Sequence, residues 1–68
     1  MKLSARNQIA ARVTSITHGE AIANVVLDAN GVRLVSSITV EALNELGIVE
    51  GSNVTAVVKA SDVMLGVA

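Results

Sequence analysis

The chain has 68 residues, of which 51% are hydrophobic, contains no Phe, Trp, Tyr, Cys or Pro, and carries a formal net charge of −1 at pH 7. Residues 1–68 therefore form a single small domain, and one core of this size supplies only about 3–5 kcal/mol of stability. The absence of Cys excludes disulfides and Cys-based zinc sites, and the single His18 cannot build a His-rich metal site. We expect self-association to supplement the core.

The charge pattern also limits the partners. Five Lys/Arg and six Asp/Glu are spread without runs, and no aromatic side chain is present to stack on a base, so we expect no nucleic-acid partner. The first six residues contain no apolar h-region, and apolar residues elsewhere are interrupted by polar ones, which predicts neither a signal peptide nor a membrane span. We expect a cytoplasmic protein.

The first half of the chain predicts three strands. Alternating, β-branched-rich sequence indicates strands at residues 8–17 and 21–28, separated by a turn at His18-Gly19-Glu20. The pair Asn30-Gly31 between two apolar runs is typical of a tight hairpin. A third strand is expected at residues 32–38.

The period changes at Thr39. Val40, Leu43 and Leu46 recur at helical spacing, Thr39 is an N-cap candidate, and Gly47 stands where a left-handed C-cap residue is expected. The sequence predicts a helix of one or two turns.

Two further strands are expected after the helix, at residues 53–59 and 63–67, with a break at Ala60-Ser61-Asp62. Five strands with one short helix between the third and the fourth predict an all-β fold, a small five-stranded OB-type barrel. Short hairpin connections favour antiparallel pairing.

No catalytic constellation is present. His18 lies in a Gly-containing turn, where an exposed polar residue is expected, and no Ser has a base and an orienting residue set beside it. Glu41 and Glu45 are four residues apart and are expected to share the solvated face of the helix. We therefore predict that the protein is not an enzyme.

Hydrogen-bond donors gather near both ends of the chain. Ser4 and Arg6 open the first strand, and Lys59 and Ser61 close the fourth. A tetrahedral dianion offers only acceptors, so a site of cations, hydroxyls and backbone N–H groups without a carboxylate suits it. The alternative is that these side chains are simply solvated.

Three segments of the chain resemble the molbindins, the small molybdate-binding proteins of the Mop type. The segments are Ser-Ala-Arg-Asn-Gln at residues 4–8, Leu-Gly-Ile-Val-Glu-Gly at 46–51 and Val-Thr-Ala-Val-Val-Lys-Ala-Ser-Asp-Val-Met at 54–64. The opening Ser-Ala-Arg-Asn is the most specific of them, and the resemblance covers essentially the whole chain.

The resemblance implies an OB-like five-stranded fold, a cytoplasmic hexamer arranged as a trimer of dimers, and molybdate or tungstate bound between subunits. The implied ligand set is Ser4, Ala5 and Arg6 of one subunit and Lys59, Ala60 and Ser61 of another, with Thr39 adding a hydroxyl. Some relatives carry Ser where this chain has Ala42, so one hydroxyl contact is missing here.

The implied function is storage or buffering of molybdate or tungstate, with the metal held only as its oxyanion and with no organic cofactor. The alternative is a structural or regulatory assembly module in which Arg6 and Lys59 form interface salt bridges and no oxyanion binds. An oligonucleotide-binding barrel is suggested by fold class alone, and the missing aromatic residues oppose it.

Overall fold

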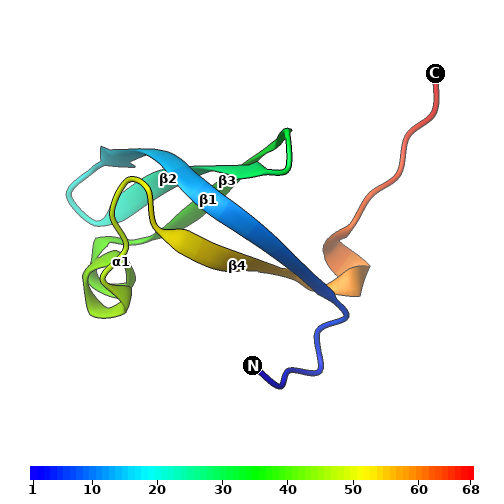
Figure 1. Ribbon diagram of the computed structural model, residues 1–68, viewed down its shortest axis with the longest axis horizontal. Helices are drawn as coiled ribbons and strands as arrows, with labels where there is room; N and C mark the ends of the chain where they lie inside the picture. The colour runs from blue at the N-terminus through cyan, green and yellow to red at the C-terminus, as the bar shows by residue number, and fades with distance from the viewer.

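A computed structural model describes residues 1–68 as one open antiparallel sheet with a short helix (Figure 1). Its elements are β1 (Asn7–His18), β2 (Ile22–Ala29), β3 (Val32–Thr39), α1 (Val40–Leu46), β4 (Asn53–Val58) and the 3-10 helix η1 (Ala60–Asp62). The strand order is β3-β2-β1-β4. The mostly β class, the first four strands and the helix predicted from the sequence are confirmed, with each strand end within one residue of its predicted place.

The long strand β1 holds the sheet together because it pairs with two neighbours. Its first half, residues 7–12, pairs with β4, and residues 12–18 pair with β2. The register with β2 shifts between Val13 and Ser15, so that Thr14 is an extra residue without a partner. Such a β-bulge bends a strand and increases its twist. The Thr14 hydroxyl donates to the Val26 carbonyl at 3.2 Å.

The predicted hairpin between β2 and β3 is confirmed. Ala29 pairs with Val32, which leaves Asn30 and Gly31 as a two-residue loop. Both have positive φ, 53° and 93°, as the mirror-image turns that suit hairpin twist require. The Asp28 carboxylate accepts a hydrogen bond from the Gly31 N–H at 2.9 Å, which further fixes the turn.

Both predicted caps of α1 are present. The Thr39 hydroxyl accepts the Ala42 N–H at 3.0 Å, and Gly47 has the left-handed φ of 65°. The Val40 N–H donates to the Ala21 carbonyl at 2.8 Å, which ties the start of the helix to the chain just before β2. Leu43 points into the core and is 1% exposed.

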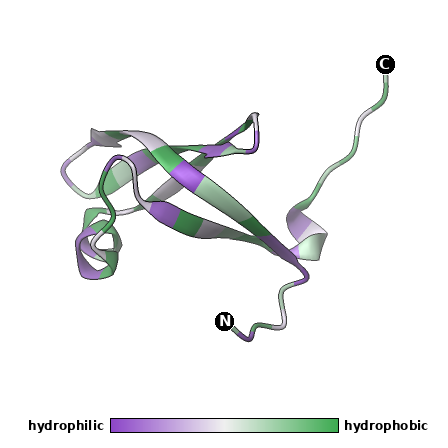
Figure 2. Ribbon diagram, viewed as in Figure 1, coloured by the Kyte–Doolittle hydropathy of each residue, from purple (hydrophilic) through white to green (hydrophobic).

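The core is small and lies on one face of the sheet, beneath α1. Buried or half-buried residues alternate with exposed ones along β2, β3 and β4. Figure 2 shows bands of hydrophobic and hydrophilic residues along the strands. The seven buried residues of the core are Ala11, Val13, Ala23, Val25, Leu27, Ala29 and Leu43. Many larger apolar side chains stay exposed, so one chain does not cover its own hydrophobic surface.

The predicted fifth strand, Val63–Val67, does not form in this chain, and the sheet does not close into the predicted five-stranded barrel. After η1 the chain runs away from the sheet (Figure 1), and Met64, Leu65 and Val67 are 92%, 94% and 101% exposed. Its one backbone hydrogen bond is local, from the Val63 N–H to the Ala60 carbonyl. A strand needs a neighbouring edge to pair with, and this segment reaches none within its own chain.

We expect Leu43→Ala to lower the free energy of unfolding by about 2–5 kcal/mol, because it leaves a cavity under α1 at the most deeply buried leucine. Urea denaturation at fixed protein concentration measures the change. The control is Glu45→Ala on the exposed side of the same helix, expected to stay within about 0.5 kcal/mol of wild type. Equal effects of the two variants would contradict this assignment of the core.

Candidate functional site

The donor-rich segments found in the sequence line one depression at the end of the β1–β4 pair. This depression, which we call the end pocket, has a volume of about 550 Å³ and is lined by Ser4, Ala5, Arg6, Lys59, Ala60 and Ser61. Figure 1 shows the segment before β1 and the turn after β4 meeting at this corner of the molecule. Six of the seven predicted site residues are thus brought together.

Strand register explains why these residues meet. The last pair between β1 and β4 is Asn7 with Val58. Continuing the antiparallel register outward sets Arg6 opposite Lys59, and the residues before Arg6 opposite those after Lys59. Two cations directly opposite each other repel, so this corner is electrostatically suited to hold an anion between them.

Donors in the end pocket are free to act on a ligand. The N–H groups of Ser4, Ala5, Arg6 and Lys59 donate to no backbone carbonyl of the chain. The side chains of Ser4, Arg6, Lys59 and Ser61 add two hydroxyls and two cations, and no carboxylate is among the lining residues. This set can donate several hydrogen bonds to an oxyanion and would not repel its charge.

The resemblance implies that the Arg6 segment of one copy meets the Lys59 segment of another, and this contact between copies stays a prediction. Both segments line the end pocket within one chain. The sequence already held the signal, since pairing the first strand with the fourth in antiparallel register brings their outer ends together.

Thr39 does not line the end pocket. It ends β3, at the opposite edge of the sheet from β4, and its hydroxyl already accepts the Ala42 N–H as the cap of α1. The single chain therefore gives Thr39 a role in stabilising the helix. A contact from Thr39 to a ligand in the end pocket requires a second copy.

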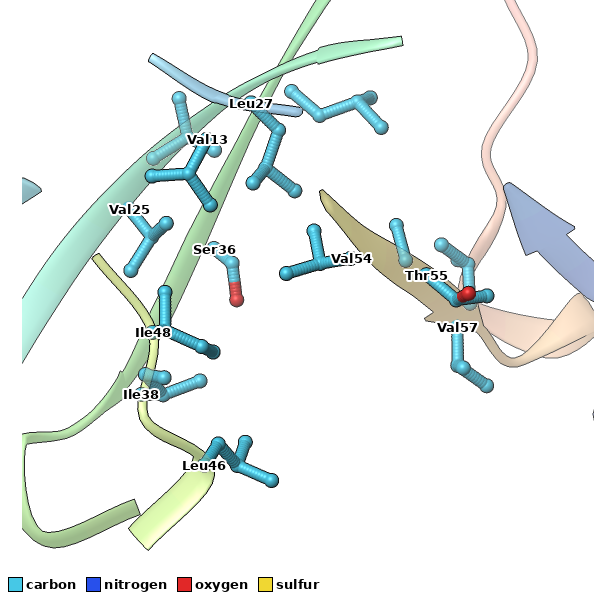
Figure 3. A pocket seen from close by; sticks show the side chains of 14 residues that line it. Val13, Val25, Leu27, Ser36, Ile38, Leu46, Ile48, Val54, Thr55 and Val57 are labelled. Atoms are coloured by element: carbon cyan, nitrogen blue, oxygen red, sulfur yellow. The ribbon is translucent and has the colours of Figure 1, made fainter. Parts of the chain in front are cut away.

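A second concavity, the apolar groove, has a volume of about 360 Å³ and lies over the inner face of the sheet (Figure 3). Val13, Val25 and Leu27 form one wall, Val54 and Val57 another, and Ile38, Leu46 and Ile48 lie at its α1 end. With few polar groups, the groove is suited to apolar side chains and not to an anion.

The other polar residues examined in the sequence gather at no common site. His18 ends β1 and is exposed, and Glu41 and Glu45 are exposed on α1. No three His, Asp or Glu side chains come close enough together to hold a metal ion. The structure contains no helix with the length and apolar character needed to cross a membrane.

One contact of the end pocket was not predicted from the sequence. The Gln8 side-chain amide donates to the Ala5 carbonyl at 3.2 Å. Gln8 does not line the end pocket and is the last residue of the Ser-Ala-Arg-Asn-Gln segment. No pattern of residue types signals such a contact.

Residues 3–65 match the model of the TOBE domain family. Molybdenum-pterin-binding protein 2 of Clostridium pasteurianum is 44% identical over 66 residues, which cover 96% of this chain and 97% of that protein.

Solved structures agree with this match. A molybdate binding protein from Sporomusa ovata superposes with a TM-score of 0.91 at 40% identity, covering 96% of this chain and 97% of that one. MopII from Clostridium pasteurianum superposes with a TM-score of 0.90 at 42% identity, covering 97% of this chain and 100% of that one.

Because the Thr39 hydroxyl caps α1, we expect Thr39→Ala to lower the free energy of unfolding by about 0.5–2 kcal/mol. Thr39→Ser keeps the oxygen and should retain most of the stability. Urea denaturation of the three proteins measures the difference. Equal stability of Thr39→Ala and wild type would show that the cap contributes nothing.

Proposed function

This chain belongs to the TOBE domain family and, within it, to the molbindins, and from that premise we propose that it binds molybdate in the end pocket. The observation that carries the proposal is that Arg6 and Lys59 lie beside hydroxyl and backbone donors in one pocket, which no acidic residue lines. This chain covers nearly the whole length of the relatives whose names include molybdenum or molybdate, and this similarity supports the same ligand here.

A pocket that only donates hydrogen bonds selects among oxyanions by their protonation. Molybdate and tungstate are tetrahedral dianions at neutral pH, so every oxygen can accept. Phosphate carries at least one proton at pH 7, and a donor-only lining leaves that proton without an acceptor, at a cost of about 1–3 kcal/mol. Sulfate is also a deprotonated dianion, and we infer that the larger size of molybdate and tungstate separates them from it.

The relatives' names pair molybdenum with a pterin, and we propose the oxyanion alone as the ligand here. A pterin ring bound together with the oxyanion calls for an aromatic side chain or an apolar slot beside the end pocket, and the chain has no aromatic residue. The end pocket is lined by Ser, Ala, Arg and Lys only. Tungstate has the charge and shape of molybdate, so we expect both to bind.

We further propose that the protein acts as a homo-oligomer, the hexamer implied by the family, in which the barrel is completed between copies. Within one chain the apolar groove is open, while Met64, Leu65 and Val67 are fully exposed on a segment that pairs with nothing. Burying apolar surface stabilises by about 25 cal/mol per Å². If the 63–67 segment of another copy packed against the inner face of the sheet, the apolar groove and the exposed side chains of that segment would both be buried.

The proposed role is storage or buffering of the oxyanion, not catalysis, with residues 1–68 acting as one oxyanion-binding domain. A store serves an intracellular supply, so we propose a cytoplasmic location.

If binding occurs only in the assembled form, the anion stabilises that form by mass action, and molybdate raises the melting temperature. A structural or regulatory assembly module would instead form an oligomer that is indifferent to oxyanions.

We expect Arg6→Ala to weaken molybdate binding about tenfold to more than a hundredfold, because it removes a charge-assisted hydrogen bond of about 1.5–3 kcal/mol. Isothermal titration calorimetry measures the affinity, with sulfate, phosphate and a pterin as comparison ligands. The matched control is Arg33→Ala, which removes the same charge from β3, outside the end pocket. Molybdate binding that is absent in wild type, or equal in Arg6→Ala, would exclude the proposed site.

We expect Leu65→Asp to break the assembly into smaller species, because the substitution would place an unpaired charge in the covered groove. Native mass spectrometry reports the number of copies, expected to be six for wild type. In an isolated chain this side chain is 94% exposed, so a protein that does not use the segment for assembly would tolerate the change.

Val49→Asp is the control for that experiment. Val49 is 62% exposed and does not line the apolar groove, so this variant should assemble as wild type does. A hexamer that persists in Leu65→Asp would refute the proposed seating of the 63–67 segment.

A further inference from the structure

The segment that carries half of the end pocket has almost nothing to hold it in place. Residues 1–6 lie before β1 and take part in no backbone–backbone hydrogen bond. The hydrogen bond from the Gln8 side-chain amide to the Ala5 carbonyl, 3.2 Å long, is the one that fastens them to the sheet. Gln8 is the second residue of β1 and lies opposite Val57 of β4, so its backbone is fixed by the strand pair.

This contact determines which edge of one peptide group is available to a ligand. The peptide unit between Ala5 and Arg6 is planar and trans, so its carbonyl and its N–H point in opposite directions. With the Ala5 carbonyl held toward Gln8, the Arg6 N–H is held on the other side, and it donates to no backbone carbonyl.

The orientation matters because both residues of that peptide line the end pocket. A carbonyl oxygen turned into the pocket would present negative partial charge to an anion, whereas an N–H presents a donor. A side chain that fastens the carbonyl elsewhere therefore removes one repulsive arrangement and reduces the ordering that the segment undergoes on binding.

Resting on the proposed function, we propose that Gln8 is a positioning residue for the oxyanion site. Its amide keeps the Ala5 carbonyl turned aside and the Arg6 N–H available to the anion, without touching the anion itself. Gln8 is exposed and outside the pocket lining, so its side chain is not needed for the core.

The test compares Gln8→Met with wild type. Met has similar length and cannot donate, so the strand is preserved and the tether is lost. We expect molybdate affinity, measured by calorimetry, to fall about threefold to tenfold, as the loss of one neutral hydrogen bond predicts. The melting temperature of the ligand-free protein should stay unchanged.

Thr14→Val is the matched control. The Thr14 hydroxyl also donates from β1 to a backbone carbonyl at 3.2 Å, and its bond to Val26 lies away from the end pocket. This variant should bind molybdate as wild type does. An equal loss of affinity in the two variants would overturn the proposal, because the effect would then be general to β1.

A second readout needs no ligand. In ligand-free Gln8→Met, the Arg6 amide signal in a ¹⁵N–¹H spectrum should shift and its heteronuclear NOE should fall as the segment becomes more mobile, while the amides of residues 11–13 stay unchanged. Wild-type affinity in Gln8→Met, or an unchanged Arg6 amide, would refute the positioning role. Failure of wild type to bind molybdate would instead refute the proposed function, and the amide measurement would still decide whether Gln8 orders the segment.

Discussion

The antiparallel pairing of β1 with β4 is the constraint on which the candidate site depends. Asn7 opposite Val58 leaves the chain just outside the pair with Arg6 and Lys59 across from each other. The proximity of the two cations is repulsive and does not stabilise the chain. The neighbouring backbone N–H groups donate to no backbone carbonyl of the chain. The sheet therefore brings two positive charges and unpaired hydrogen-bond donors together at one corner.

A similar incompleteness holds for the hydrophobic surface. The chain buries only seven residues, all but one of them on β1 and β2, and the remaining core member comes from α1. The inner sides of β3 and β4 face an open groove instead of a second layer. The end pocket and the apolar groove share no lining residue, so the polar and the apolar surfaces that one chain leaves uncovered are physically separate.

Local signals in the sequence were sufficient for the local structure. Thr39, Gly47 and the Asn30-Gly31 pair each act within a few residues, and each does in the structure what its chemistry predicts. The barrel failed as a prediction for one chain because residues 63–67 have strand-like composition but no edge to pair with. The six residues that line the end pocket were predicted from the sequence, but their meeting within one chain depends on the register of β1 with β4. The Gln8 contact depends on side-chain geometry that no spacing encodes.

The extra residue in β1 has a consequence for reading related sequences. Val13 and Ile16 are three positions apart, yet both pack with the core, because Thr14 reverses the inside-outside phase of everything that follows it. Strict alternation would put Ile16 on the same side as Arg12. The bulge thus reverses which side of the sheet every later residue of the strand faces. A homologue that lacks one residue there would have to exchange polar and apolar positions throughout the rest of the strand to keep apolar side chains in the core.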